Sequence, residues 1–256
     1  MRYFITLSYD GTRYHGWQVQ PNGISVQGEL QRGLSLLFRD DLQVTGAGRT
    51  DAGVHASMMV AHFDTDREVD CRQLAYKLNR LLPHDIAISK VEPVRDYLHA
   101  RFSATRRTYH YFVHTHKDPF LRHYSCELHY PLDFAQMNEA ASLLLTYEDF
   151  GAFCKSHADV KTTLCHVTKA EWTEMSSGQW RFEITANRFL RNMVRAVVGT
   201  LLEVGKHRLT LEGLEDVVRA GNRSASGESM PACGLFLQDI TYPDALFLSG
   251  KAPKIF

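Results

Sequence analysis

The chain has 256 residues, 44% of them hydrophobic, and its 29 basic residues balance 29 acidic ones. This length and composition indicate a folded chain that forms one large globular unit or two fused small domains. Its five scattered cysteines do not make a disulfide framework in a chain of this size. No apolar run approaches the roughly 20 residues that span a bilayer, and the N-terminus does not resemble a signal peptide, so we expect a cytoplasmic protein with no membrane partner.

The first half of the chain alternates strand and helix patterns. Ser25 and Asp70 are suitable N-caps for two amphipathic helices, and Pro83 stops the second. In chain order, the predicted elements are a strand at 3–9, a helix at 26–38, strands at 42–45 and 58–63, a helix at 70–81 and a strand at 86–91.

The second half repeats this mixture after a weak boundary at 100–106. The predicted elements are a strand at 106–113, a helix at 133–145, strands at 167–174 and 180–186, helices at 190–205 and 210–220, and a strand at 234–242. The architecture that both halves favour is α+β, with two halves joined through a shared sheet.

A loop framed by three glycines separates two predicted strands of the first half. It runs over 46–55 and carries Asp51, with Arg49 two residues earlier. Arg49 is a candidate to keep the Asp51 carboxylate ionised by charge pairing, and an ionised carboxylate is a competent nucleophile. Spacing alone leaves a second interpretation open, in which Asp51 only stabilises a turn.

Other candidate residues lie on predicted elements of the second half. Arg191 and Arg195 are four apart on the long predicted helix, where a partly buried arginine needs an anionic partner such as Asp51, unless it extends to solvent. Tyr109 and Tyr111 are candidates to stack on an RNA base or to belong to the core.

Basic residues also cluster near aromatic ones, as a groove for an RNA backbone requires and as a solvated charged face also shows. They are Arg101, Arg106, Arg107, Arg181, Arg188, Arg191 and Arg195. A metal site built from Cys154, His157, Cys165 and His166 is disfavoured, because adjacent side chains in a strand face opposite ways. We therefore expect no metal.

Several ordered blocks, spread over nearly the whole chain, resemble the TruA-type tRNA pseudouridine synthases. GAGRTDAGVHA at 46–56 resembles the catalytic signature of that family, and YDGTRYHGWQVQPN at 9–22 resembles its N-terminal block. The other similar blocks are SVQGEL at 25–30, HARFSATRRTYHY at 99–111, DFGAFC at 149–154, FLRNMVRAVVGTLLEVG at 189–205 and PACGLFLQDITYP at 231–243. The chain departs from the family pattern at Cys126, where tryptophan is expected, and at Arg191 and Asn192.

The resemblance implies roles for five residues. The catalytic aspartate of the family matches Asp51, and the arginine that acts in substrate binding and base extrusion matches Arg49. The active-site tyrosine matches Tyr109, the arginine that pairs with the catalytic carboxylate matches Arg195, and a wall of the pocket begins at Leu235.

The resemblance also implies a reaction and partners. The expected activity is isomerisation of uridine to pseudouridine at positions 38, 39 and 40 of the tRNA anticodon stem-loop, with no cofactor. The implied enzyme is a homodimer with a pseudouridine synthase fold of two ferredoxin-like halves, 1–103 and 104–256, which share a mixed, mainly antiparallel sheet with the active-site cleft between them. Whether Asp51 attacks the sugar or removes a sugar proton stays open.

Two other classes of protein share some of these features. A non-catalytic RNA-binding module has the same basic and aromatic strands but no need for the loop around Asp51. A hydrolytic glycosidase needs a second carboxylate near the bond, and the nearest ones in sequence, Asp64 and Asp66, follow a strand that leads away from the loop.

Overall fold

The computed structural model describes residues 1–155, 160–248 and 250–254. The chain forms two compact units, of which the first comprises Met1–Arg106 and the C-terminal segment from Phe236 onward. The second unit comprises Arg107–Leu235. In the part of the chain so described, no helix is both long enough and apolar enough to cross a membrane.

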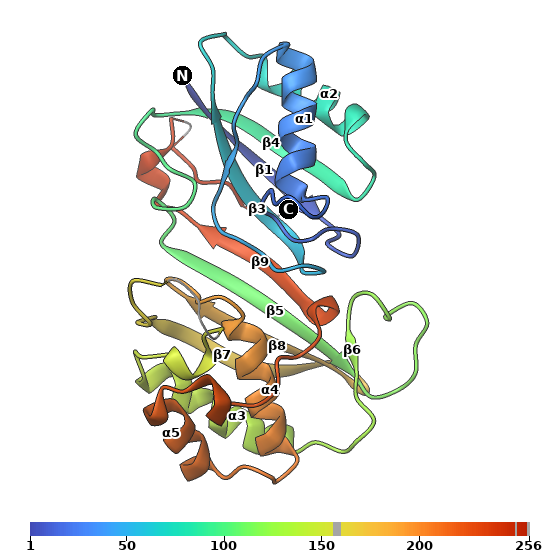
Figure 1. Cartoon of the computed structure of the whole chain (residues 1–256), viewed down its shortest axis with the longest axis vertical. Helices are drawn as coiled ribbons and strands as arrows, with labels where there is room; N and C mark the ends of the chain where they lie inside the picture. Colours follow the sequence, from blue (N-terminus) through green and yellow to red (C-terminus); the bar gives the residue numbers. More distant parts are fainter. Residues whose placement is uncertain (156–159, 249, 255–256) are drawn as a thin grey trace. The chain divides into compact units, whose positions relative to one another are not determined.

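The first unit is built on a mixed sheet with the strand order β4-β1-β3-β9, and the short β2 pairs with β3 (Figure 1). All neighbouring strands are antiparallel except β3 and β9, which are parallel. Together with two helices the elements follow the βαββαβ order of a ferredoxin-like half. Their bounds are β1 Arg2–Tyr9, α1 Val26–Phe38, β2 Thr45–Gly46, β3 His55–Asp64, α2 Cys71–Leu81, β4 Ile86–Val94 and β9 Leu235–Thr241.

Both helices of the first unit begin at the predicted N-caps. The Ser25 side chain accepts a hydrogen bond from the amide of Gly28, and the Asp70 side chain accepts one from the amide of Gln73. Each cap satisfies an amide that the first turn of a helix leaves without a partner. Helix α1 ends where Arg39 adopts a left-handed conformation with φ 53°. Side-chain caps therefore set where both helices of this unit begin, and a left-handed residue sets where α1 ends.

The second unit contains an antiparallel sheet with the order β5-β8-β7, and a short β6 lies parallel to β5. The strands are β5 Arg106–His114, β6 Cys126–Glu127, β7 Val167–Ser176 and β8 Gln179–Ala186. The helices are α3 Phe134–Leu143, α4 Met193–Gly205 and α5 Leu211–Ala220, and α4 is buried along most of its length. Short 3₁₀ helices lie at Leu144–Thr146, Gly151–Phe153, Arg223–Ala225 and Ala232–Gly234 in this unit, and at Asp244–Leu246 in the first unit.

The period of two in these strands separates an apolar face from a polar one. Opposite Tyr111 on β5 lies Phe182 on β8, and next to Phe182 on β7 lies Trp172, which packs against Phe134 of α3. The residues between them in sequence point to the other face of the sheet. The helices therefore cover one face, and the charged residues of these strands occupy the opposite face.

The predicted α+β class and the mainly antiparallel pairing are confirmed, but several predicted elements differ in extent, including β3, which begins three residues earlier than predicted. The strand predicted at 42–45 is confined to Thr45–Gly46. Leu42 and Val44, which gave the apolar pattern, are buried, but among the described residues they pair with no neighbouring strand. The helix predicted from Leu190 begins only at Met193, because Asn192 has a left-handed φ of 68° that an α-helix cannot continue.

His62 on β3 gives the first unit a pH-dependent stability. The ring is buried, and its Nδ1 accepts a hydrogen bond from the amide of Ala100 at 3.2 Å. Burial, followed by the nearby positive charges of Arg2 and His99, lowers the pKa of His62 from its ordinary 6.5 to about 4. The neutral ring is therefore the form that the folded state favours.

We expect the free energy of unfolding to fall by about 2–3 kcal/mol as the pH drops from 6.5 to 4, because the unfolded chain binds a proton at His62 that the folded chain rejects. His62→Asn should remove this part of the slope, and His84→Asn at an exposed position should leave it unchanged. Urea unfolding at a series of pH values measures how the free energy of unfolding depends on pH. An identical slope in His62→Asn and the parent chain would contradict the assignment.

Candidate functional site

The loop that carries Asp51 connects two paired strands. Residues 47–54 join β2 to β3, and the amide of Ala47 donates to the Val60 carbonyl at 2.8 Å just beyond the pairing. Within the loop Thr50 is buried, Asp51 is half-buried and Arg49 is exposed. The paired strands β2 and β3 thus fix where the loop begins and ends, and Asp51 is partly accessible to solvent.

The N-terminal block holds the loop immediately before Asp51. The hydroxyl groups of Tyr9 and Thr50 lie 2.9 Å apart in a buried hydrogen bond. The amide of Trp17 donates to the Thr50 carbonyl at 3.2 Å. Both the side chain and the backbone of the residue before Asp51 are therefore fixed by a segment more than 30 positions earlier in the sequence.

The same block holds the loop after Asp51. The amide of Gly53 donates to the Tyr14 carbonyl at 3.2 Å, and the amide of Gly11 donates to Nδ1 of His55 at 3.1 Å. The buried His55 ring also stacks on Phe236 with 4.5 Å between ring centroids. Hydrogen bonds on both sides of Asp51 restrict its backbone, which is the condition for a side chain held in one orientation.

Two glycines of the N-terminal block make this close approach possible. A Cβ atom at Gly11 would overlap the Val54 carbonyl oxygen, and one at Gly16 would overlap the Thr50 carbonyl oxygen. Gly16 also has φ +92°, which L side chains rarely adopt. The sequence alone gave the block at 9–22 no structural role, although its two glycines and its aromatic residues are typical of a tight contact between backbones.

We expect Gly11→Ala and Gly16→Ala each to destabilise the chain by about 1–3 kcal/mol and to lower turnover, because the loop must shift to accept a methyl group. Gly48→Ala is the matched control within the loop itself, since a Cβ there meets nothing within 4 Å. Thermal unfolding and turnover of the three variants check this. Equal losses at Gly11 and Gly48 would show that the contact with the N-terminal block does not matter.

Tyr109 and Tyr111 differ in exposure, although both lie on the same face of β5. Tyr109 is half-buried, and its ring makes an edge contact with Phe189 at 5.0 Å between centroids. Tyr111 is fully buried, and its hydroxyl donates to the Pro231 carbonyl at 2.8 Å. Burial also raises the pKa of Tyr111. Tyr111 is thus a core residue, and only Tyr109 stays a candidate to stack on a base.

Arg195 lies half-buried on α4 and is anchored to the segment before β9. Its Nε donates to the Met230 carbonyl, and the Met230 amide donates back to the Arg195 carbonyl at 3.2 Å. The Gly227 amide donates to the Thr200 hydroxyl at 2.8 Å, so residues 227–230 run along the helix. The hydrogen bond from Nε to Met230 therefore restricts the conformations of the Arg195 side chain.

Leu235 begins β9 directly after the short helix at Ala232–Gly234 and is buried. Gly234 lies against the Tyr111 ring so closely that a Cβ there would touch it. The position of Leu235 therefore depends on the same segment that anchors Arg195.

Arg191 does not share a helix face with Arg195, which corrects the prediction from sequence. Helix α4 begins at Met193, so Arg191 precedes it and is exposed. The apolar spacing of Leu190 continues the helical pattern, but the left-handed Asn192 turns the backbone before the first helical residue. Arg191 and Asn192 are also the positions at which the sequence departs from the family pattern described above.

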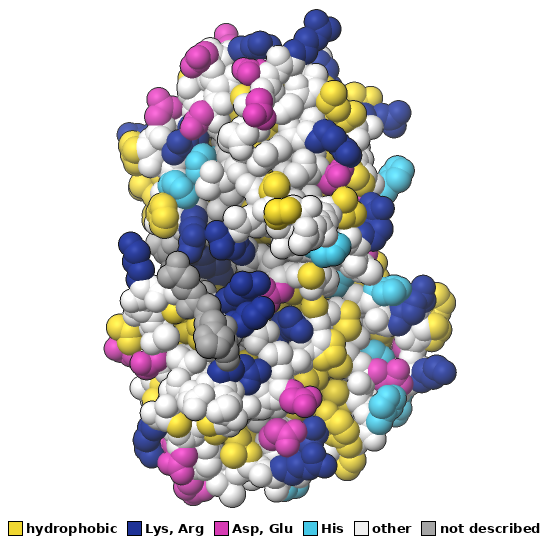
Figure 2. All heavy atoms as spheres, in the orientation of Figure 1, with side chains coloured by type: hydrophobic (Ala, Val, Ile, Leu, Met, Phe, Trp, Pro, Cys, Tyr) yellow, Lys and Arg dark blue, Asp and Glu magenta, His cyan; other side chains and the backbone are white. Residues whose placement is uncertain are grey.

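The predicted basic cluster contains both half-buried and exposed arginines. Arg107 donates to the Asn187 carbonyl at 2.9 Å, and Arg188 donates to the Thr162 carbonyl at 3.2 Å. Arg101 and Arg106 in the first unit are exposed. On the face drawn in Figure 2, acidic and basic side chains are interspersed over both units.

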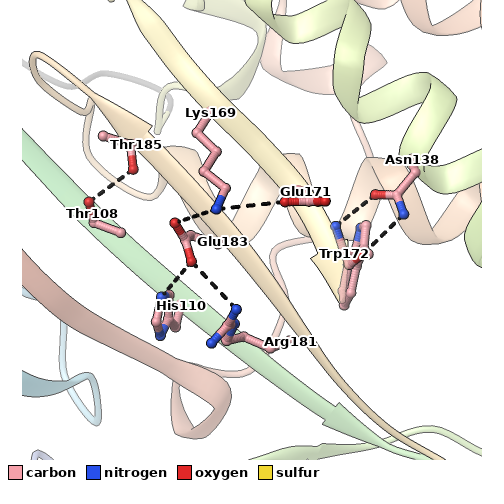
Figure 3. A network of polar contacts seen from close by, with 9 residues as sticks. All are labelled: Thr108, His110, Asn138, Lys169, Glu171, Trp172, Arg181, Glu183 and Thr185. Carbon is pink, nitrogen blue, oxygen red and sulfur yellow. Dashed lines mark hydrogen bonds and ion pairs between the residues drawn. The ribbon is translucent and has the colours of Figure 1, made fainter. Parts of the chain in front are cut away.

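Arg181 belongs to a network on the polar face of the second unit (Figure 3). Glu183 lies at its centre, 3.0 Å from Lys169 Nζ, 3.2 Å from His110 Nε2 and 3.6 Å from a terminal nitrogen of Arg181. Burial acts to raise the pKa of Glu183, but its contacts with Lys169, His110 and Arg181 outweigh burial and lower that pKa. The network joins β5, β7 and β8, so we assign Arg181 a structural role in the sheet.

Neither metal binding nor a catalytic role for Asp64 gains support. Over 1–155, 160–248 and 250–254, no group of three or more His, Cys, Asp or Glu side chains is placed to hold a metal ion. His157 lies outside the described residues. Asp64 ends β3 and forms an ion pair with Arg2 at 2.7 Å, at the far end of the strand from the Asp51 loop.

Comparisons with known proteins show the family to which the chain belongs. The family model described as tRNA pseudouridine synthase matches residues 5–103 and 140–243. The chain is 54% identical over 247 residues to a tRNA pseudouridine synthase A of Bacteroides fragilis, covering 96% of this chain and 98% of the relative. It is 40% identical over 246 residues to a tRNA pseudouridine synthase A of Bacillus subtilis, covering 94% of this chain and 99% of the relative.

These matches define an RNA-modifying enzyme of the isomerase class. The chain belongs to the tRNA pseudouridine synthase family, as a TruA-type member, and the resemblance seen in its sequence is confirmed.

Proposed function

We propose that this chain isomerises uridine to pseudouridine at positions 38, 39 and 40 of the tRNA anticodon stem-loop, with Asp51 as the nucleophile. The family match supports the reaction and its tRNA substrate. The observation that supports Asp51 is its place in a loop whose backbone is hydrogen-bonded on both sides, next to the buried Thr50. Such preorganisation is what a group that acts on one atom of a bound substrate requires.

The reaction is balanced within the nucleoside. The bond from N1 of uracil to C1′ of the sugar breaks, the base turns, and a bond from C5 to C1′ forms. C5 loses its proton to solvent and N1 gains one, so the product is an isomer and no electrons are exchanged. We therefore propose no cofactor. Asp51 acts at the sugar while the uracil leaves as a stabilised anion.

We assign the other site residues to supporting roles. Tyr109 stacks on the extruded base and relays the C5 proton, and its half-buried ring braced by Phe189 supports this role. By the family resemblance, Arg195 pairs with the catalytic carboxylate, Arg49 binds the substrate and assists base extrusion, and Leu235 forms a wall of the pocket. The exposed side chain of Arg49 suits contact with a nucleic acid from solvent.

The first test measures release of tritium from tRNA transcribed with 5-tritiated uridine. Asp51→Asn should lower the rate at least about 10³-fold, because the amide cannot act as a nucleophile. Asp66→Asn, which changes an exposed carboxylate of the same unit, should retain the parent rate. Release by Asp51→Asn at the parent rate would remove the nucleophile assignment, even if the reaction itself is observed.

The modified positions are tested with tRNA transcripts that keep a single uridine among positions 38, 39 and 40. Each transcript should release tritium, and a transcript with cytidine at all three positions should release none. Undiminished release from the last transcript would place the target elsewhere in the tRNA.

We also propose that the enzyme works as a homodimer in the cytoplasm, where tRNA is found. A second copy enlarges the basic surface that a chain of balanced charge offers to RNA. Sedimentation equilibrium at working concentration should give twice the mass of the chain, and a single species of monomer mass would refute the dimer.

A further inference from the structure

The turn before β5 exposes an aromatic ring among positive charges. Phe102 is 77% exposed and Tyr97, five residues earlier, is 66% exposed. Arg95, Arg101 and Arg106 are exposed in the same stretch of chain, together with one carboxylate, Asp96. Single exposed apolar residues are ordinary on protein surfaces, so exposure alone assigns no role to Phe102.

The turn itself, residues 99–103, is held in one conformation by its own hydrogen bonds. Nδ1 of His99 accepts from the amides of Arg101 at 3.0 Å and Phe102 at 3.3 Å. The Ser103 amide donates to the His99 carbonyl at 2.9 Å, and the His99 amide donates to the Ser103 hydroxyl at 3.0 Å. The direction of the Phe102 Cα–Cβ bond is therefore fixed.

The turn is also anchored in the core of the first unit. Leu98 and Ala100, on either side of His99, are fully buried. The Ala100 amide donates to His62, and the Ala100 carbonyl accepts from the Tyr242 hydroxyl at 2.5 Å. Phe102 is therefore exposed on a segment whose backbone is already fixed. A ligand that binds there loses little free energy to ordering of the chain.

The neighbours of the ring define the chemistry of its ligand. The His99 ring lies 4.3 Å from the Phe102 ring between centroids, and the Arg101 guanidinium carbon lies 5.7 Å from the Phe102 centroid. An exposed aromatic ring beside a guanidinium group suits an unpaired base with its phosphate. Protein partners bind instead at contiguous apolar patches, and here the contacts of the exposed ring are with an imidazole and a guanidinium group.

We propose that Phe102 is a stacking subsite for an unpaired base of the RNA substrate, away from the reacting uridine, with Arg101 contacting a neighbouring phosphate. This inference rests on the proposed function for its ligand, tRNA, but not on any step of the chemistry. Base stacking on Phe102 contributes to affinity and leaves the rate of the bound substrate unchanged.

The test is equilibrium binding of an unmodified tRNA transcript to the full-length chain. Phe102→Ala should weaken binding about 5- to 100-fold and raise KM with kcat unchanged, and Phe102→Trp should bind within about twofold of the parent chain. Phe120→Ala is the matched control, because Phe120 is 84% exposed in the second unit. An equal loss in Phe120→Ala would overturn the assignment to Phe102.

Salt dependence separates stacking from charge. Phe102→Ala should weaken binding by the same factor at every salt concentration, whereas Arg101→Gln should reduce the slope of log affinity against log salt by about 0.7 for one lost phosphate contact. Unchanged affinity and KM in Phe102→Ala, with an active parent chain, would overturn the proposal. A parent chain that binds tRNA but forms no pseudouridine would refute the proposed function and leave the binding result to stand.

Phe102→Leu guards against a folding artefact, because it keeps apolar bulk and removes the aromatic face. Its urea unfolding midpoint should equal that of the parent chain, while its affinity for tRNA falls. Parent affinity in this folded variant would show that bulk suffices and that no base stacks on the ring.

Discussion

The hydrogen bonds between the N-terminal block and the Asp51 loop are the constraint on which the rest of the first unit depends. A loop rich in glycine has few side chains with which to hold itself, so its order must come from outside. Tyr9 and Trp17 fix Thr50, and Gly11 permits the backbone contact that joins β1 to the start of β3. A carboxylate that acts on one sugar atom gains from this arrangement, because the cost of orienting it is met during folding.

The helices could be predicted from the sequence because their ends depend on neighbouring residues. Ser25 and Thr210 accept hydrogen bonds from amides three residues later, and Gly221 adopts the left-handed conformation that ends α5. The contact of Tyr9 with Thr50 joins residues 41 positions apart, and no local pattern carries that information. The start of α4 was missed for a related reason, since apolar spacing does not report the sign of φ at Asn192.

The candidate site was predictable in residue type but not in the role of each residue. Tyr109 and Tyr111 share one face of β5, and only the segment around Pro231, far along the chain, buries the second. The arginines of the second unit divide in the same way. Arg188 satisfies a backbone carbonyl and Arg181 balances Glu183, and their partners could not be identified from spacing along the sequence. The family resemblance selected Tyr109 and Arg195 as site residues, whereas periodicity alone did not distinguish them from Tyr111 and Arg191.

A neutral chain that acts on RNA must obtain affinity from a few local features, since its overall charge supplies none. An arginine that binds a carbonyl or a carboxylate within the fold is not available to bind an RNA phosphate. Fewer phosphate contacts make a smaller part of the affinity for RNA dependent on salt. Stacking on a fixed aromatic ring is insensitive to salt and selects bases that are not paired, so it favours loops over helical stems. A rigid Phe102 turn beside exposed arginines would therefore add both affinity and a preference for the unpaired part of a stem-loop, independently of how Asp51 performs the reaction.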